Sequence, residues 1–119
     1  MRPYLLIAIL LLSYGIVLAD GVPEVAGFNV ERLATAIYKA EGGAKTRHPY
    51  GILAKYKHTT PRQACINTIV HKYMDWVSAG NPGRFIDYLA SRYAPVGAKN
   101  DPNGLNKNWV KNVEYFYNE

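Results

Sequence analysis

Apolar residues along most of the chain recur at spacings of three and four positions, the repeat of an amphipathic helix rather than of a strand. Four segments have this pattern: about 30–41, 60–79, 85–94 and 106–116. No internal repeat and no linker divides them. The sequence therefore predicts a single, compact, mainly α domain built around four helices.

End signals mark the first two helices. Asn29 and Thr60 suit N-cap positions, and Pro61 suits the first helical position, where its missing N–H would have no partner. The pair Gly42-Gly43 ends the first helix, because glycine adopts the left-handed conformation of a helix C-terminus without strain.

The segment between these two helices, residues 45–59, breaks the helical pattern. Residues 48–51 (His-Pro-Tyr-Gly) have the composition of a turn. Residues 52–56 are expected to form either one short strand or an irregular crossing. We therefore expect a long loop of functional character after the first helix.

The first nineteen residues have the three parts of a secretory signal peptide. They are a basic start at Arg2, an apolar run over Tyr4–Leu12 and small residues before a cut after Ala19. The alternative is an uncleaved membrane anchor, but its apolar stretch of about sixteen residues is shorter than the roughly 20 that span a bilayer. We therefore expect a periplasmic or secreted domain of residues 20–119, with residues 1–19 removed and no stable membrane anchor.

The composition of the whole chain limits the partners and metal sites that we expect. The formal net charge of +5 suits an anionic partner without naming one. The one cysteine, Cys65, excludes an internal disulfide, and its apolar neighbours predict a buried, inert thiol. His48, His58 and His71 lack the spacing of a helical metal-binding pair, so no metal is expected.

Nucleic acid and nucleotide cofactors find little support in the sequence. The basic run at residues 55–58 contains one tyrosine, as a surface for single strands would, but it is short. Gly42-Gly43 is not followed by the residues of a phosphate-binding loop. Neither nucleic acid nor a cofactor is therefore expected.

Glu41 is the first residue that suggests catalysis. It ends an apolar helix, where the negative end of the helix dipole disfavours a charged carboxylate. Partial burial beside Tyr38 and the loop at residues 50–52 would raise the pKa of Glu41 further. A carboxyl group that stays protonated near neutral pH can act as a general acid. The alternative, which the residues taken alone favour, is an ordinary exposed glutamate at a helix end.

Glu41 is one of several short motifs that occur in a definite order. Residues 50–52 (Tyr-Gly-Ile) follow it, and the later motifs are residues 89–95 (Leu-Ala-Ser-Arg-Tyr-Ala-Pro), 100–101 (Asn-Asp) and 109–113 (Trp-Val-Lys-Asn-Val). Together they resemble the lysozyme-like lytic transglycosylases and the small bacterial and phage muramidase-like proteins. In that family a glutamate ends a core helix and a glycine-containing loop crosses behind it. The resemblance extends over residues 37–113 and implies a lysozyme-like fold.

The resemblance also implies a mechanism. Glu41 would protonate the glycosidic oxygen between N-acetylmuramic acid and N-acetylglucosamine in peptidoglycan. It would then act as base while the muramic acid 6-hydroxyl closes onto C1 and forms an anhydro sugar. Hydrolysis through two carboxylates would need a second acid roughly 5–9.5 Å away. The candidates are Asp75 and Asp87, expected on solvated helix faces, and Asp101, expected in a turn, so transglycosylation is favoured over hydrolysis.

Tyrosine is abundant, with 10 in the chain, and its flat ring and hydroxyl suit sugar faces and sugar hydroxyl groups. Substrate-binding roles are expected for Tyr50, Gly51, Ile52, Tyr93 and Asn100. Tyr93 is also expected to hold Glu41 by a hydrogen bond, and its alternative role is packing between helices with its hydroxyl at the surface. The alternative for Asn100 is a turn.

Two departures from the family pattern keep a second function open. The family usually has serine after the glutamate and a glutamine in the loop, whereas this chain has Gly42 and no such glutamine, and it is shorter. The alternative is a non-catalytic peptidoglycan-binding or assembly subunit with the same fold, in a larger secretion, conjugation or phage assembly. Both functions make peptidoglycan glycan strands the expected partner. A small secreted helical protein with an accidental likeness is a third alternative.

Overall fold

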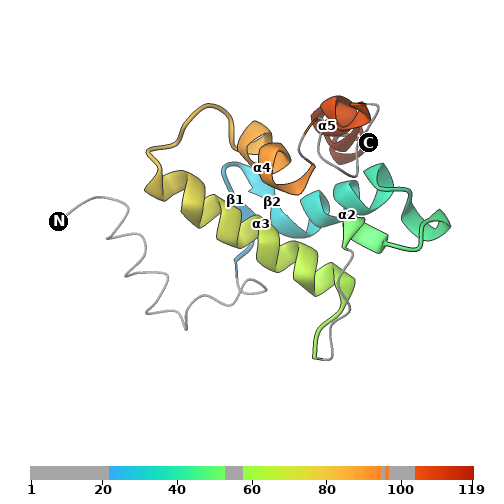
Figure 1. Ribbon diagram of the computed structural model, residues 1–119. Helices are drawn as coiled ribbons and strands as arrows, with labels where there is room; N and C mark the ends of the chain where they lie inside the picture. Colours follow the sequence, from blue (N-terminus) through green and yellow to red (C-terminus); the bar gives the residue numbers. More distant parts are fainter. Residues whose placement is uncertain (1–21, 53–57, 95, 97–103) are drawn as a thin grey trace.

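A computed structural model describes residues 22–52, 58–94, 96 and 104–119, and within them the chain is mostly helical (Figure 1). The elements in chain order are β1 (Glu24–Val25), β2 (Phe28–Asn29), α2 (Val30–Ala40), η2 (Gly43–Lys45), η3 (Pro49–Gly51), α3 (Pro61–Ser78), α4 (Phe85–Tyr93), η4 (Leu105–Asn108) and α5 (Trp109–Tyr117). The mainly α prediction is confirmed, with the last predicted helix beginning as the 3₁₀ turn η4. The predicted signal peptide lies outside the described residues.

Helix α2 begins and ends where its sequence signals predict. The Asn29 side chain accepts a hydrogen bond from the Arg32 backbone N–H at 2.9 Å and so caps the first turn. The stripe that includes Leu33 and Ile37 is fully buried. The left-handed φ of Gly42, +107°, then turns the chain away.

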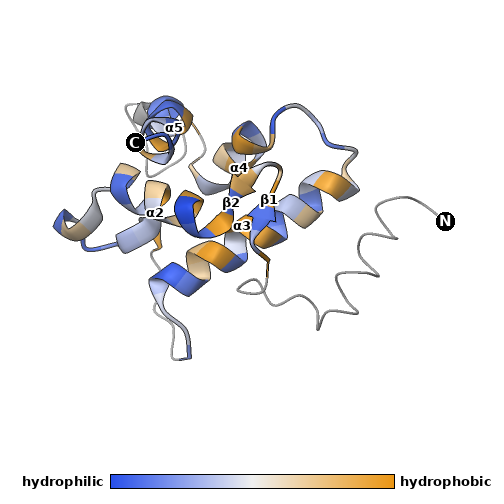
Figure 2. Ribbon diagram, turned by 180° about the vertical axis from the view of Figure 1, so that it is seen from behind, coloured by the Kyte–Doolittle hydropathy of each residue, from blue (hydrophilic) through white to orange (hydrophobic). Residues whose placement is uncertain are grey.

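Helix α3 begins in the same way. The Thr60 hydroxyl accepts from the Gln63 backbone N–H at 3.1 Å, and Pro61 occupies the first helical position. The buried residues of this helix lie between Ala64 and Val70 and include Cys65 and Ile69. In Figure 2, apolar and polar bands alternate along α3, as expected for a helix with one face in the core.

The core is centred on α2, which packs against both α3 and α5. Each helix contributes fully buried apolar side chains: Leu33 and Ile37 from α2, Ile69 from α3, Leu89 from α4 and Val113 from α5. Because α5 is the last element and α2 the first long helix, residues from the two ends of the described chain share one core.

A two-stranded hairpin precedes α2 and was not predicted. Glu24 pairs with Asn29, and Val25 pairs with Phe28. The two turn residues, Ala26 and Gly27, both have positive φ (51° and 83°), as a tight two-residue hairpin turn requires. The hairpin is the one sheet among the described residues.

The loop after α2 is irregular as far as the structure describes it. Residues 43–52 form the two 3₁₀ turns η2 and η3 and no strand. Residues 53–56, the remainder of the predicted short strand, lie outside the described part of the chain. Since Ile52 is the one described residue of 52–56, the choice between a short strand and an irregular crossing stays a prediction.

Cys65 is a buried thiol, as its apolar neighbours predicted, with no exposed surface. Burial raises the pKa of this thiol to about 12. Since the thiolate is the reactive form of cysteine, Cys65 is inert in the folded protein.

Candidate active site

Glu41 occupies the C-terminal cap of α2. Its backbone N–H donates to the Ile37 carbonyl at 2.9 Å, and the chain leaves the helix at the next residue, Gly42. The negative end of the helix dipole therefore lies next to the Glu41 carboxyl and disfavours its charge. The prediction that this glutamate ends the first long helix is confirmed.

The Glu41 carboxyl lies between two segments that are distant in sequence. The indole N–H of Trp109, the first residue of α5, donates to Glu41 Oε1 at 2.7 Å. The backbone of Gly51 approaches the carboxyl so closely that a β-carbon at residue 51 would lie 3.0 Å from Oε2 and 3.2 Å from Cδ. The carboxyl is thus confined by an N–H donor and by a backbone with no side chain.

Tyr93, at the end of α4, completes this arrangement. Its ring stacks on Trp109 with centroids 5.5 Å apart and an angle of 29° between the planes. A β-carbon at Gly51 would also lie 3.3 Å from Tyr93 Cε1. We refer to Glu41, Gly51, Tyr93 and Trp109 as the Glu41 cluster. It joins α2, η3, α4 and α5 at one point.

Burial dominates the electrostatics of Glu41. It raises the pKa of the carboxyl above its usual value of 4.5, and the weaker effect of the Trp109 hydrogen bond lowers it. Glu41 therefore retains its proton to higher pH than an exposed glutamate does, which suits a general acid. The alternative of an ordinary exposed glutamate is wrong, because the side chain is half-buried and held on both sides.

Replacing Trp109 with phenylalanine is expected to raise the Glu41 pKa further. The ring would remain, but the N–H that stabilises the charged carboxylate would be lost. Loss of this hydrogen bond also costs about 1–3 kcal/mol of stability. A ¹³C NMR titration of the Glu41 carboxyl measures the change. Trp76→Phe is the matched control, since the Trp76 indole donates to the Pro82 carbonyl instead; an equal shift in both variants would contradict the assignment.

The predicted hydrogen bond from Tyr93 to Glu41 is wrong. The Tyr93 ring lies beside Gly51, and its hydroxyl donates to the carbonyl of the preceding residue, Tyr50. Trp109 makes the bond that was expected of Tyr93. Tyr93 is nevertheless in contact with the site and is half-buried rather than a surface hydroxyl.

Tyr50 and Ile52 flank Gly51 in the loop. Tyr50 has a left-handed backbone (φ 63°), its ring lies 5.0 Å from the Tyr38 ring, and its hydroxyl accepts from Arg62. Ile52 is half-buried, and its N–H donates to the Pro49 carbonyl at 3.2 Å. The loop therefore brings Tyr50 and Gly51 to Glu41 as predicted. Asn100 and Asp101 lie outside the described residues.

Two residues of the site, Trp109 and Arg62, were not predicted as functional. Trp109 lies on the apolar stripe of the last predicted helix, and such a position is typical of a core residue. A buried indole N–H needs an acceptor, and this requirement is the one signal that pointed to a polar partner. Arg62 follows Pro61 at a helix start, where no sequence pattern distinguishes it.

Gly42 has a conformational reason to differ from the serine of the resembled family. With φ +107°, it adopts a backbone conformation that side chains disfavour, and a β-carbon there would lie 3.4 Å from Thr46 Cβ. The turn after Glu41 therefore favours glycine at residue 42, where the resembled family usually has serine.

Neither described candidate for a second carboxylate belongs to the Glu41 cluster. Asp75 is exposed and pairs with Lys72 at 3.4 Å, about 20 Å along α3 from the turn that contacts the loop. Asp87 is exposed in the first turn of α4 and pairs with Arg84 at 2.9 Å. Both are solvated helix residues, as predicted.

The described histidines are exposed: His48 before η3, His58 before α3 and His71 on α3. In the described part of the chain, no three side chains among histidine, cysteine, aspartate and glutamate gather as metal ligands would.

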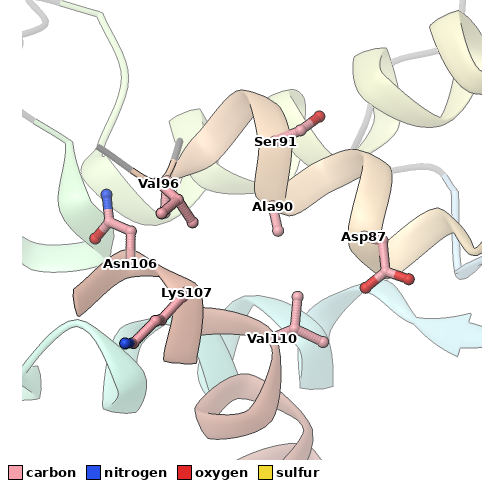
Figure 3. A pocket seen from close by; sticks show the side chains of 8 residues that line it. Asp87, Ala90, Ser91, Val96, Asn106, Lys107 and Val110 are labelled. Atoms are coloured by element: carbon pink, nitrogen blue, oxygen red, sulfur yellow. The ribbon is translucent and has the colours of Figure 1, made fainter. Parts of the chain in front are cut away.

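The helices that hold Tyr93 and Trp109 also line an open pocket of about 380 Å³ (Figure 3). Its lining comes from α4, the residues that follow α4, η4 and α5: Asp87, Ala90, Ser91, Ala94, Val96, Asn106, Lys107 and Val110. Small side chains such as Ala90 and Ala94 leave this space open. The cavity is separate from the residues that contact the Glu41 carboxyl.

Comparison with family models, curated proteins and solved structures found no match to this chain. Among the described helices, none is both long enough and apolar enough to cross a membrane. The features of the chain that bear on function are therefore the Glu41 cluster and the order of motifs in the sequence.

Proposed function

We propose that this chain is an exported lytic transglycosylase with a lysozyme-like fold, which cleaves peptidoglycan between N-acetylmuramic acid and N-acetylglucosamine. The observation that supports this most directly is the half-buried Glu41 carboxyl at a helix end, held between the Trp109 N–H and the Gly51 backbone. Burial favours its protonated form, and a general acid must begin the reaction in that form.

The proposed reaction uses one carboxyl group in two steps. Glu41 first donates its proton to the glycosidic oxygen, the bond from that oxygen to C1 of the muramic acid breaks, and N-acetylglucosamine leaves with a hydroxyl. The resulting Glu41 carboxylate then accepts the proton of the 6-hydroxyl, and O6 bonds to C1. Glu41 ends protonated again and no water is consumed, so neither Asp75 nor Asp87 is required.

The aromatic residues around the site support a sugar substrate. The Tyr50 ring pairs with Tyr38, and the hydroxyl of Tyr50 is already engaged by Arg62. We assign Tyr50 a contact through its ring rather than through its hydroxyl. The hydroxyl of Tyr93 is engaged by the Tyr50 carbonyl, so Tyr93 shapes the site by its ring. Ile52 and Asn100 remain proposed contacts.

Product analysis tests the proposal. Purified protein is incubated with purified peptidoglycan, and the soluble fragments are identified by mass spectrometry. Anhydromuramyl ends are the expected product. Reducing ends would contradict the one-carboxylate mechanism and indicate a hydrolase. No soluble product from folded protein would contradict catalysis, and retention of the protein on peptidoglycan would then favour the binding subunit.

A further inference from the structure

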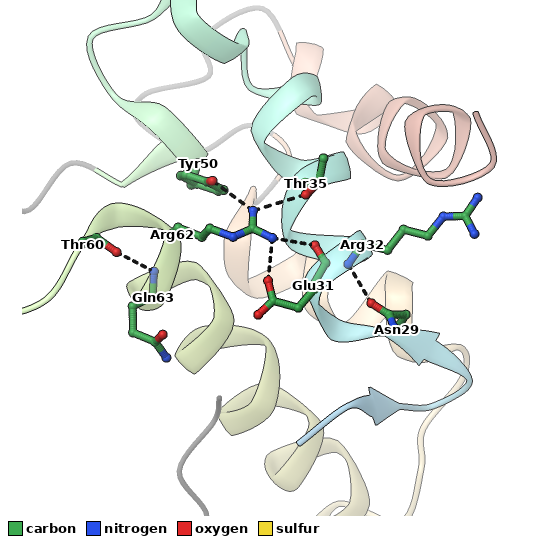
Figure 4. Close-up of polar contacts among 8 residues, drawn as sticks. All are labelled: Asn29, Glu31, Arg32, Thr35, Tyr50, Thr60, Arg62 and Gln63. Carbon is green, nitrogen blue, oxygen red and sulfur yellow. Dashed lines mark hydrogen bonds and ion pairs between the residues drawn. The ribbon is translucent and has the colours of Figure 1, made fainter. Parts of the chain in front are cut away.

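Arg62, in the first turn of α3, joins three elements near Glu41 (Figure 4). One of its guanidinium nitrogens donates to Thr35 Oγ1 at 3.2 Å and to the Tyr50 hydroxyl at 3.1 Å. The other donates to the Glu31 carbonyl at 3.0 Å and to its Oε2 at 2.6 Å. Arg62 therefore connects α2, the loop of Tyr50 and α3.

The position of Tyr50 gives these bonds a consequence at the site. Tyr50 immediately precedes Gly51, the residue whose backbone lies against the Glu41 carboxyl. Both residues have positive φ (63° and 70°), and for Tyr50 this conformation is strained. Contacts from outside the loop must hold it there, and Arg62 supplies one on the side chain while Tyr93 supplies one on the carbonyl.

We infer that Arg62 is a positioning residue, which holds the Tyr50-Gly51 backbone against Glu41 and keeps water from that side of the carboxyl. The inference rests on the proposed function for its catalytic consequence, but its structural consequence can be measured without substrate. Arg62 acts through the loop. Its hydrogen bonds among the described residues go to Thr35, Tyr50 and Glu31, and none goes to the Glu41 carboxyl.

The charge of Arg62 and its positioning role predict opposite changes at Glu41. A nearby positive charge stabilises a carboxylate, so removing that charge alone would raise the Glu41 pKa. Releasing the loop would admit water to the carboxyl and lower the Glu41 pKa, because burial is the main cause of its elevation. The direction of the change therefore separates the two roles.

The other titratable groups around Glu41 do not change their charge in the pH range of this test. Among the described residues, Cys65 of α3 and Tyr93 of α4 interact electrostatically with the carboxyl. Burial raises the pKa of both, to about 12 for Cys65, so both stay neutral through the range in which a carboxyl titrates. From α5 the carboxyl meets the Trp109 indole, which does not titrate.

The experiment compares Arg62→Lys, which keeps the charge and loses the planar donor fork, with Arg62→Gln, which loses both. The Glu41 pKa is measured by ¹³C NMR, with the signal assigned from Glu41→Gln. Positioning predicts a lower Glu41 pKa in both variants and a loss of cleavage at neutral pH of roughly 10- to 100-fold. An unchanged pKa in both folded variants, or a rise confined to Arg62→Gln, would overturn the inference.

Two further variants serve as a second test and as a control. Tyr50→Phe removes only the hydroxyl that accepts from Arg62, so it should lower the Glu41 pKa even where an Arg62 variant fails to fold. Arg84→Lys is the matched control, because Arg84 also forms ion pairs, with Asp87 and Glu114; it should leave the Glu41 pKa unchanged. The NMR result stands whether or not wild-type protein cleaves peptidoglycan, so failure of the proposed function is distinguishable from failure of this inference.

Discussion

Replacing Glu41 with glutamine is expected to reduce peptidoglycan cleavage by at least 100-fold while the protein stays folded. General acid–base groups contribute roughly 10²–10⁴-fold to rate, and the proposed mechanism uses this one group twice. Glutamine has nearly the same shape, and its oxygen can still accept from the Trp109 indole N–H. The measurement is the rate of release of soluble fragments from peptidoglycan.

The same variant is expected to be more stable than the wild type at neutral pH. Because burial raises the folded-state pKa of Glu41, the folded protein binds this proton more tightly than the unfolded chain does. Its stabilising contribution is fully present below the usual pKa of 4.5 and is lost as the pH rises through the folded-state value. Thermal unfolding should therefore show a difference at pH 7 that shrinks as the pH falls through the folded-state pKa toward 4.5 and stays constant below 4.5.

Glu24→Gln is the matched control for both effects. Glu24 is exposed in β1, away from the Glu41 cluster. The same change there should leave cleavage unaltered. If Glu41→Gln cleaved peptidoglycan at the wild-type rate, Glu41 would not be the acid. If its unfolding followed that of Glu24→Gln at every pH, burial of the Glu41 carboxyl would be contradicted.

Replacing Gly51 with alanine is the second change expected to have a large effect. The left-handed backbone, φ +70°, costs alanine about 1–2 kcal/mol. The new β-carbon would also meet Glu41 Oε2 at 3.0 Å, so either the carboxyl or the loop must move. Crowding of this kind costs about 1–3 kcal/mol more. A displacement near 1 Å would reduce cleavage by roughly 100-fold.

Gly83→Ala separates backbone strain from crowding. Gly83 has φ +67°, almost that of Gly51, but a β-carbon there would meet nothing within 4 Å. It should lose only the roughly 1–2 kcal/mol of left-handed strain and should keep its cleavage rate. Urea unfolding and cleavage assays compare the two variants. Equal losses of stability with full activity in both would contradict the close approach of Gly51 to Glu41.

The helices could be predicted because their signals are local. Asn29 and Thr60 cap the helices that follow them within three residues, and Glu41 ends α2 because Gly42 turns the chain. The hairpin of Glu24–Asn29 was missed because strands of two residues are too short for an alternating pattern to develop.

The contacts that make the site could not be predicted in the same way. Glu41 and Trp109 are 68 residues apart, and Arg62 lies 31 residues from Glu31. Such pairs depend on how α5 and α3 dock onto α2, which no local pattern specifies. The resemblance placed Gly51 and Tyr93 near Glu41, but it assigned the hydrogen bond to Tyr93, whose hydroxyl donates to the Tyr50 carbonyl instead.

The long sequence separation between Glu41 and Trp109 has a consequence for biosynthesis. Chains are made from the N-terminus, so α2 and its glutamate leave the ribosome well before α5 exists. Until α5 docks, the carboxyl lacks the Trp109 hydrogen bond and the cover that α5 supplies. A nascent or partly folded chain would therefore lack a competent acid. Under the proposed function, Glu41 would become a competent acid only once α5 had been made and had docked onto α2.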